Sequence, residues 1–262
     1  MIPEAAIISW RSTAPWPQDA QVEQDLILSR ALVEIFSDST LAKSLLLRGG
    51  TALHKLVVGR PLRYSEDIDL VQAKAGPIGP VLDAMRSRLD PILGEPRRGR
   101  SAGSVALRYR MESEIPPVTP LRLKLEINTR EHFAVYGPVV RGFRVRSPWF
   151  SGSAEVRTYT MDELLSTKMR ALYQRRKGRD LFDLWIGLRT RGVSARRIVA
   201  GFRRYMKAGG HQVNRVAMEK NLEAKVASRE FTGDLRSLLA PGIRYDARRA
   251  GALVKSKLFS LF

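Results

Sequence analysis

One segment, residues 45–72, constrains the fold more than any other part of the chain. It begins with three leucines at 45–47 and continues into Gly49-Gly50. The following TALHKLVV suits a helix, so the pattern predicts a strand, a tight turn and a helix. Seventeen residues after Gly50, an Asp-Ile-Asp sequence at 67–69 opens another apolar run, which predicts a second buried strand.

Periodic patterns place further elements in the first 160 residues. Apolar residues recur at helical spacing over 21–36 and 80–93, where we expect Pro91 to disturb the second helix. Strict alternation over 105–110 and 121–128 predicts two strands joined through a proline-containing turn. Shorter strands are expected near 133–136, 139–145 and 156–159.

Helical patterns dominate after Thr160. Thr160 and Glu163 match a capping box, and Asp180 is expected to cap a second helix that ends at Gly192. Further helices are expected at about 195–207, 212–228 and 233–239, with a last one toward the C-terminus. The sequence therefore predicts an α+β protein, with a mixed α/β domain over residues 1–160 and an all-helical basic domain over 161–262.

The net charge of +19 is concentrated in one part of the chain. Residues 164–262 contain 23 Lys/Arg and 7 Asp/Glu, which accounts for +16 of the total. This asymmetry indicates a polyanionic partner such as RNA, with a solvated charged face as the alternative. The densest cations, too many for the acids near them in sequence, are Arg170, Arg175, Arg176, Lys177, Arg179, Arg189, Arg191, Arg196, Arg197, Arg203, Arg204 and Lys207.

Composition excludes several classes of protein and site. The chain has no cysteine, which excludes disulfides, thiolate zinc sites and cysteine nucleophiles and fits a cytoplasmic location. Three scattered histidines argue against an imidazole metal cluster. No stretch approaches about 18 apolar residues and the N-terminus lacks a basic flank, so we expect a soluble, non-secreted protein without membrane contact.

The Asp-Ile-Asp strand is suited to bind divalent cations. Side chains two apart on a strand point the same way, so Asp67 and Asp69 present both carboxylates to one side. Mg²⁺, or Mn²⁺ in its place, takes oxygen ligands and can neutralise the oxygens that attack and leave in a nucleotidyl transfer. Glu126, on the polar face of a predicted strand, is the candidate third ligand and candidate base. A merely solvated pair of aspartates is the alternative.

The glycine pair is suited to bind phosphate. Gly49, Gly50 and Thr51 offer backbone N–H groups at the positive end of a predicted helix, which suits the oxygens of a nucleoside triphosphate. Ser65 and Arg63 are further phosphate-binding candidates, although Arg63 could instead pair with a nearby acid. The segment matches neither the P-loop nor the G-x-G-x-x-G fingerprint.

Lys168 lies on the apolar face of its predicted helix. A lysine aimed inward usually has an anionic partner, because a buried unpaired charge is costly. That partner is either a triphosphate, which makes Lys168 a catalytic-site residue, or Asp183 in the next helix. A side chain that extends to solvent is the remaining alternative. Asp183 could otherwise favour its own helix terminus or position Lys168 or the substrate.

Four segments, in this order, resemble the AbiEii/AbiGii (MenT-like) nucleotidyltransferase toxins of prokaryotic toxin–antitoxin systems. They are G-G-T-A-L at 49–53, R-Y-S-E-D-I-D-L at 63–70, K-M-R-A-L at 168–172 and R-D-L-F-D-L at 179–184. The resemblance spans about half of the chain. It implies a DNA polymerase β-like nucleotidyltransferase core with a helical domain behind it.

The resemblance also implies an activity. A nucleotide would pass from an NTP to an acceptor, most often the 3′ end of tRNA in the better-understood relatives, which blocks aminoacylation and translation. By position, Asp67 and Asp69 would bind metal, Lys168 and Asp183 would be essential at the nucleotide site, and Ser65 would correspond to a serine that an antitoxin modifies in some relatives. A protein side chain or small molecule as acceptor, and a non-catalytic RNA-binding protein, stay open as alternatives.

Overall fold

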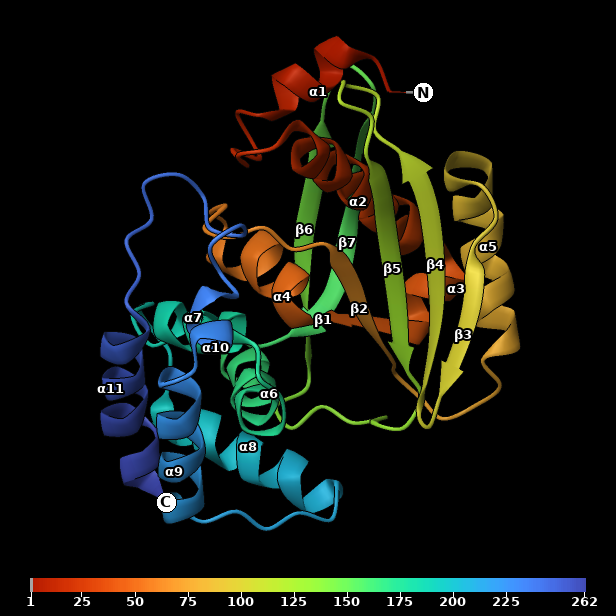
Figure 1. The fold of residues 1–262 in the computed structure, drawn as a ribbon. Coiled ribbons are helices and arrows are strands. Elements are labelled where there is room, and N and C mark those ends of the chain that lie inside the picture. Colours follow the sequence, from red (N-terminus) through yellow and green to blue (C-terminus); the bar gives the residue numbers. More distant parts are fainter. Residues whose placement is uncertain (1) are drawn as a thin grey trace. The chain divides into compact units, whose positions relative to one another are not determined.

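A computed structural model describes residues 2–262, and over that range the strands form one seven-stranded mixed sheet (Figure 1). The strands are β1 (Leu45–Arg48), β2 (Asp67–Gln72), β3 (Arg97–Ser101), β4 (Ser104–Glu112), β5 (Pro120–Asn128), β6 (Pro138–Arg146) and β7 (Ser151–Tyr159). Their order is β3-β4-β5-β2-β1-β7-β6. The β2·β5 and β1·β7 pairs are parallel and the other neighbours are antiparallel.

Helices precede, separate and follow the strands. Before β7 they are α1 (Glu4–Trp10), α2 (Asp19–Ser37), α3 (Ser39–Ser44), α4 (Gly49–Ala52), the π-helix η1 (Leu53–Val58) and α5 (Gly79–Leu93). After β7 they are α6 (Met161–Gln174), α7 (Gly178–Gly187), α8 (Ala195–Ala208), α9 (Arg215–Val226), α10 (Arg229–Gly233), α11 (Ala247–Lys257) and the 3₁₀-helix η2 (Phe259–Leu261). No helix within residues 2–262 is long and apolar enough to cross a membrane.

The chain divides into two compact units. The first comprises the chain up to Phe133 together with Pro138–Tyr159, and it contains the sheet. The second comprises Ala134–Gly137 and Thr160–Phe262, and it contains α6 to α11 and η2. Whether the C-terminal helices form an independent domain stays a prediction.

In the first unit, helices cover one face of the sheet. Helix α2 packs on β2, β5, β6 and β7, and α5 packs on β4. Along β5, Leu121, Leu123 and Leu125 are buried, whereas Arg122 between them is exposed. Strands β3, β4 and β5 turn their other face to the viewer in Figure 1, with no helix of residues 2–262 in front of them. The alternation of the sequence therefore correctly indicates which side chains of β4 and β5 lie inward.

Several predicted elements of the first unit are confirmed and a few are wrong. The helix over 21–36 and the strands at 45–47, 105–110 and 121–128 correspond to α2, β1, β4 and β5. Pro91 does not end α5, because it lies in the last turn and the helix continues until Gly94 adopts a φ of 76°. Strand β3 and helices α1 and α3 were not predicted. The RRGRS sequence of β3 has no apolar residue that could produce a periodic pattern.

The predicted strand at 133–136 is wrong, and Glu163 provides the reason. The Glu163 carboxylate accepts the backbone N–H groups of Val135 and Tyr136 at 2.6 and 3.1 Å and the Tyr205 hydroxyl at 2.6 Å. These backbone groups are therefore satisfied by a side chain instead of a neighbouring strand. Thr160 caps α6 as predicted, but Glu163 does not complete the capping box.

Two other predictions for the second unit fail. Helix α7 begins at Gly178, so Asp180 lies inside its first turn and is not its cap. No helix spans the predicted range 233–239, because the short helix α10 ends at Gly233 and residues 234–238 form turns. Helices α8 and α9 lie close to their predicted ranges.

Candidate active site

The Asp69 carboxylate lies directly against the backbone of Gly49, where α4 begins. A β-carbon on Gly49 would lie 2.1 Å from Asp69 Oδ2, and the φ of Gly49 is 79°. Glycine is therefore required both by the close approach and by the backbone conformation. The antiparallel register of β1 and β2 places Arg48 opposite Asp69, so the turn that follows Arg48 must begin beside this carboxylate.

The second glycine accommodates a guanidinium group. A β-carbon on Gly50 would lie 2.3 Å from Arg63 Nη2 and 3.1 Å from Ser65 Oγ. The Thr51 hydroxyl lies 2.9 Å from Ser65 Oγ and donates to the Asp67 carbonyl oxygen at 2.5 Å. These contacts gather the phosphate-binding candidates around one turn, with the Thr51 hydroxyl already engaged in holding the turn to β2.

The three candidate metal ligands share one face of the sheet. In the parallel register of β2 and β5, Asp67 lies opposite Lys124 and Asp69 lies opposite Glu126. Glu126 forms an ion pair with Lys124 and accepts a hydrogen bond from Ser104 Oγ at 2.8 Å. Within residues 2–262, no three acidic or histidine side chains are grouped as a metal cage. Mg²⁺ is usually held by one or two carboxylates together with substrate phosphates, so these oxygen donors fit an ion that binds with a nucleotide.

Electrostatics keep the groups around Asp69 charged. Burial would raise the pKa of Glu126, but the hydrogen bonds from Lys124 and Ser104 outweigh it and the pKa is lowered. Burial would likewise lower the pKa of Arg48, but Glu131 and Asp69 outweigh it and the pKa is raised. Arg48, whose Nη1 lies 2.7 Å from Glu131, was not identified from the sequence, although it directly precedes the glycine pair.

A buried ion pair anchors η1 next to this turn. Lys55 Nζ lies 2.9 Å from both carboxylate oxygens of Asp25, which also accepts the indole N–H groups of Trp10 and Trp16 at 2.9 and 3.2 Å. Sequence reasoning missed this cluster, although an acid next to Leu26 on the apolar face of α2 was a usable signal.

A cavity of about 130 Å³ is lined by Lys55, Asp25 and the two tryptophans, and also by Arg63 and Ser65.

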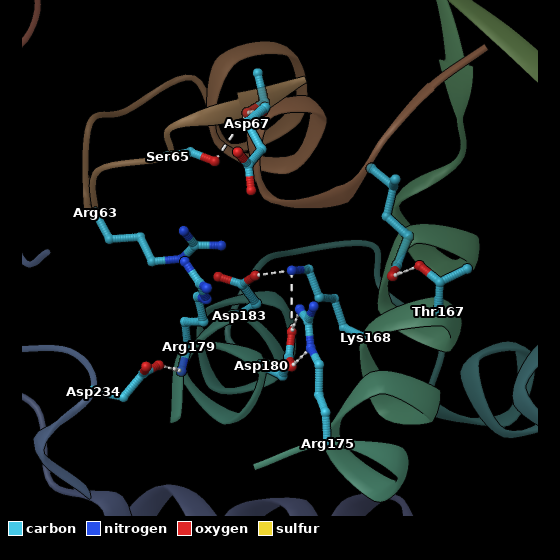
Figure 2. A network of polar contacts seen from close by, with 12 residues as sticks. Arg63, Ser65, Asp67, Thr167, Lys168, Arg175, Arg179, Asp180, Asp183 and Asp234 are labelled. Atoms are coloured by element: carbon cyan, nitrogen blue, oxygen red, sulfur yellow. Dashed lines mark hydrogen bonds and ion pairs between the residues drawn. The ribbon is translucent and has the colours of Figure 1, made fainter. Parts of the chain in front are cut away.

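In the second unit, Lys168 lies between two aspartates that are fully buried (Figure 2). Its Nζ is 2.8 Å from Asp183 Oδ2 and 3.2 Å from Asp180 Oδ1. Arg175 also binds Asp180, with Nε 2.7 Å from Oδ2. The structure thus shows the ion pair of Lys168 with Asp183 that the sequence left as one alternative. Asp180 was missed as a partner, although it lies three residues before Asp183 on the same helical face.

Asp180 is held in its charged form. Burial would raise its pKa, but Lys168 and Arg175 outweigh this effect and the pKa is lowered. Two cations, Lys168 and Arg175, thus surround the buried Asp180 carboxylate.

Much of the basic run at 170–207 is used inside the second unit. Arg197 pairs with Asp162 at 2.7 Å, and Lys177 lies 3.6 Å from Asp234. Arg170, Arg189 and Arg203 stack on the rings of Tyr205, Trp185 and Phe262. Of this run, Arg175, Lys177 and Arg197 form ion pairs with acids, and three further arginines are held by aromatic rings instead. Exposed cations without a carboxylate partner in the described chain include Arg191, Arg196 and Lys207.

Replacing Gly49 tests the close approach of Asp69. Gly49→Ala should lower the free energy of unfolding by about 1–3 kcal/mol more than Gly59→Ala, because the new methyl group overlaps the carboxylate. Gly59 is the matched control, since its φ is 64° but its β-carbon would meet nothing within 4 Å. Urea unfolding of both variants provides the measurement, and equal losses would contradict the inference.

Replacing Asp180 tests the buried cluster. Because its pKa is lowered in the folded state, Asp180 stabilises the protein above its unfolded pKa of about 3.9, and this contribution is lost as the pH falls through the folded pKa. Asp180→Asn should cost about 3 kcal/mol near pH 7, with a smaller difference from wild type below pH ~4. Urea unfolding across pH 3–7 measures the difference in unfolding free energy between the variant and wild type. The exposed Asp83→Asn is the control, and a pH-independent difference for Asp180→Asn would refute the inference.

Comparisons with known proteins identify the family of the chain. The family model described as "Nucleotidyl transferase AbiEii toxin, Type IV TA system" matches residues 30–250. No curated protein matches the sequence significantly.

Two solved structures share the fold. The nucleotidyltransferase toxin MenT4 from Mycobacterium tuberculosis has a TM-score of 0.67 at 15% identity, with 100% of this chain and 89% of that chain covered. JHP933 from Helicobacter pylori has a TM-score of 0.58 at 18% identity, with 93% and 94% covered. With a family model matching most of its length, the chain belongs to the AbiEii nucleotidyltransferase toxins of type IV toxin–antitoxin systems and is a nucleotidyltransferase.

Proposed function

We propose that this nucleotidyltransferase transfers a nucleotide from an NTP to the 3′ end of tRNA, with release of pyrophosphate and in dependence on Mg²⁺ or Mn²⁺. A blocked 3′ end cannot be aminoacylated, so translation would stop. The observation that carries the proposal is the contact between Asp69 and Gly49. It brings a carboxylate suited to a cation next to backbone N–H groups suited to phosphate, and we propose that the core around them is of the DNA polymerase β type.

The first unit would bind the triphosphate. The backbone of residues 49–51, continuous with η1, and the side chains of Arg63 and Ser65 would contact its phosphate oxygens. Asp67 and Asp69 would hold the divalent cation, which supplies charge neutralisation at the transferred phosphoryl group. Glu126 has a lowered pKa and forms an ion pair with Lys124. Its carboxylate is therefore better suited to bind a metal ion in its charged form than to act as a general base near neutral pH.

Lys168 and Asp183 are proposed as further essential residues of the nucleotide site. Lys168 would contribute a cation for a phosphate, and Asp183, at 2.8 Å, would position it. Exchanging the Asp180 contact for a phosphate contact would leave Lys168 paired with Asp183 and Asp180 paired with Arg175, so no buried charge would be left without a partner.

The family description also supports a protein partner. As a member of a type IV toxin–antitoxin family, the chain is proposed to have a cognate antitoxin, with Ser65 as the serine available for modification. We place the protein in the cytoplasm, where NTP and tRNA are found.

Label transfer tests the activity. The protein is incubated with total RNA, Mg²⁺ and each NTP carrying a radioactive α-phosphate. We expect label in RNA of tRNA size with at least one NTP, no label from the γ-position and no transfer in EDTA. Asp69→Asn should reduce transfer at least about 100-fold, because loss of charge stabilisation worth several kcal/mol raises the barrier.

The control is Asp83→Asn, an identical change at an exposed position of α5. It should retain wild-type transfer. Label that enters protein and survives RNase would favour a protein acceptor. The absence of transfer to RNA from all four NTPs, or transfer that persists in EDTA, would overturn the proposal.

A further inference from the structure

The open face of the sheet carries a row of cations that begins beside Asp67. In register, Lys124 of β5 lies opposite Asp67, Arg108 of β4 lies opposite Lys124, and Arg97 of β3 lies opposite Arg108. Residues opposite one another project from the same face of a sheet. The row crosses three strand spacings, or about 14 Å.

A second pair of cations lies two residues further along β4 and β5. Arg110 of β4 is opposite Arg122 of β5, on the same face as Arg108. Arg97, Arg108, Arg110 and Arg122 are exposed, and none has a carboxylate partner within the described chain. The acids on this face of β4 and β5 are Glu126, which pairs with Lys124, and Glu112 at the end of β4.

The opposed cations lower the stability of the folded protein unless an anion binds over them. Like charges directly opposite one another on neighbouring strands repel. The row is also closely packed, because a β-carbon on Gly99 of β3 would lie 2.3 Å from Arg108 Nη1. The face holds no aromatic side chain on β2, β3, β4 or β5, so it offers charge to phosphates but no platform for stacked bases.

We infer that this face binds the backbone of the acceptor RNA and guides its single-stranded end toward Asp67 and Asp69. The inference rests on the proposed function and deepens it by locating the RNA-binding surface on strands of the first unit. Recognition is through phosphates and is therefore largely independent of base sequence. The four arginines supply donors in the forked geometry that suits phosphate oxygens.

The test compares two double variants of equal charge. Arg108→Gln with Arg110→Gln removes two cations from the open face. Arg98→Gln with Arg100→Gln removes two from β3, at positions opposite Leu107 and Val105, and therefore from the other face. Fluorescence anisotropy with labelled, unfractionated tRNA gives the dissociation constant between 50 and 300 mM salt, and transfer kinetics give KM for tRNA and for NTP.

The open-face variant should bind tRNA roughly tenfold more weakly at low salt, with the slope of log K against log[salt] reduced by about 1.4, because each lost contact to a single strand contributes about 0.7. Its KM for tRNA should rise while its KM for NTP stays unchanged, and its thermal unfolding temperature should not fall, because the double change relieves repulsion between opposed arginines. The β3 control should resemble wild type. This pattern would support the inference.

Equal losses in both variants, or wild-type tRNA affinity in the open-face variant, would overturn it. In the second case an acidic protein would be the better candidate for this face. If the wild-type protein transfers no nucleotide to RNA, the proposed function fails. The affinity comparison still decides whether this face binds RNA, so the two failures are distinguishable.

Discussion

The close approach of the Asp69 carboxylate to Gly49, which leaves no room for a β-carbon, is the constraint on which the candidate site depends. Any side chain at Gly49 would occupy the space of the carboxylate, and the positive φ of this residue directs the chain from β1 into α4. The same turn brings Gly50 against Arg63 and lets Thr51 hold Ser65 and the Asp67 carbonyl group. A carboxylate beside the positive end of a helix is itself favourable, so the geometry that suits a ligand also stabilises the fold.

The net charge of a sequence segment does not predict where exposed, unpaired cations gather on the surface of the folded protein. The C-terminal 99 residues hold most of the net charge, yet many of their arginines bind carboxylates or stack on aromatic rings of the same unit. The first 163 residues are nearly balanced, with 22 Lys/Arg and 19 Asp/Glu. Strand pairing nevertheless gathers four exposed arginines, Arg97, Arg108, Arg110 and Arg122, on one face of β3, β4 and β5. Net charge by segment therefore overstated one basic surface and missed another.

Local patterns predicted those elements whose buried face is apolar. The alternation in β4 and β5, the helical spacing in α2 and the strand–turn–helix at the glycine pair were all visible. Elements without that signature were missed or misplaced. Strand β3 has only polar residues and glycine, and segment 134–137 owes its conformation to Glu163, a partner distant in sequence. The position of Lys168 on an apolar helix face correctly predicted a buried anionic partner, but not that Asp180 would be one of two.

The sequence by itself determined the order of the motifs, the family they resemble, and the face of each strand that bears Asp67, Asp69 and Glu126, because side-chain alternation is a local property of the backbone. The tertiary structure alone decided which of these groups meet. Register places Glu126 beside Asp69 and Arg108 beside Lys124, and it depends on pairings between residues far apart in the chain. Likewise, only the tertiary structure shows that the ion pair between Lys55 and Asp25 anchors η1. The two residues are thirty positions apart in the sequence, and they meet because the fold brings η1 next to α2.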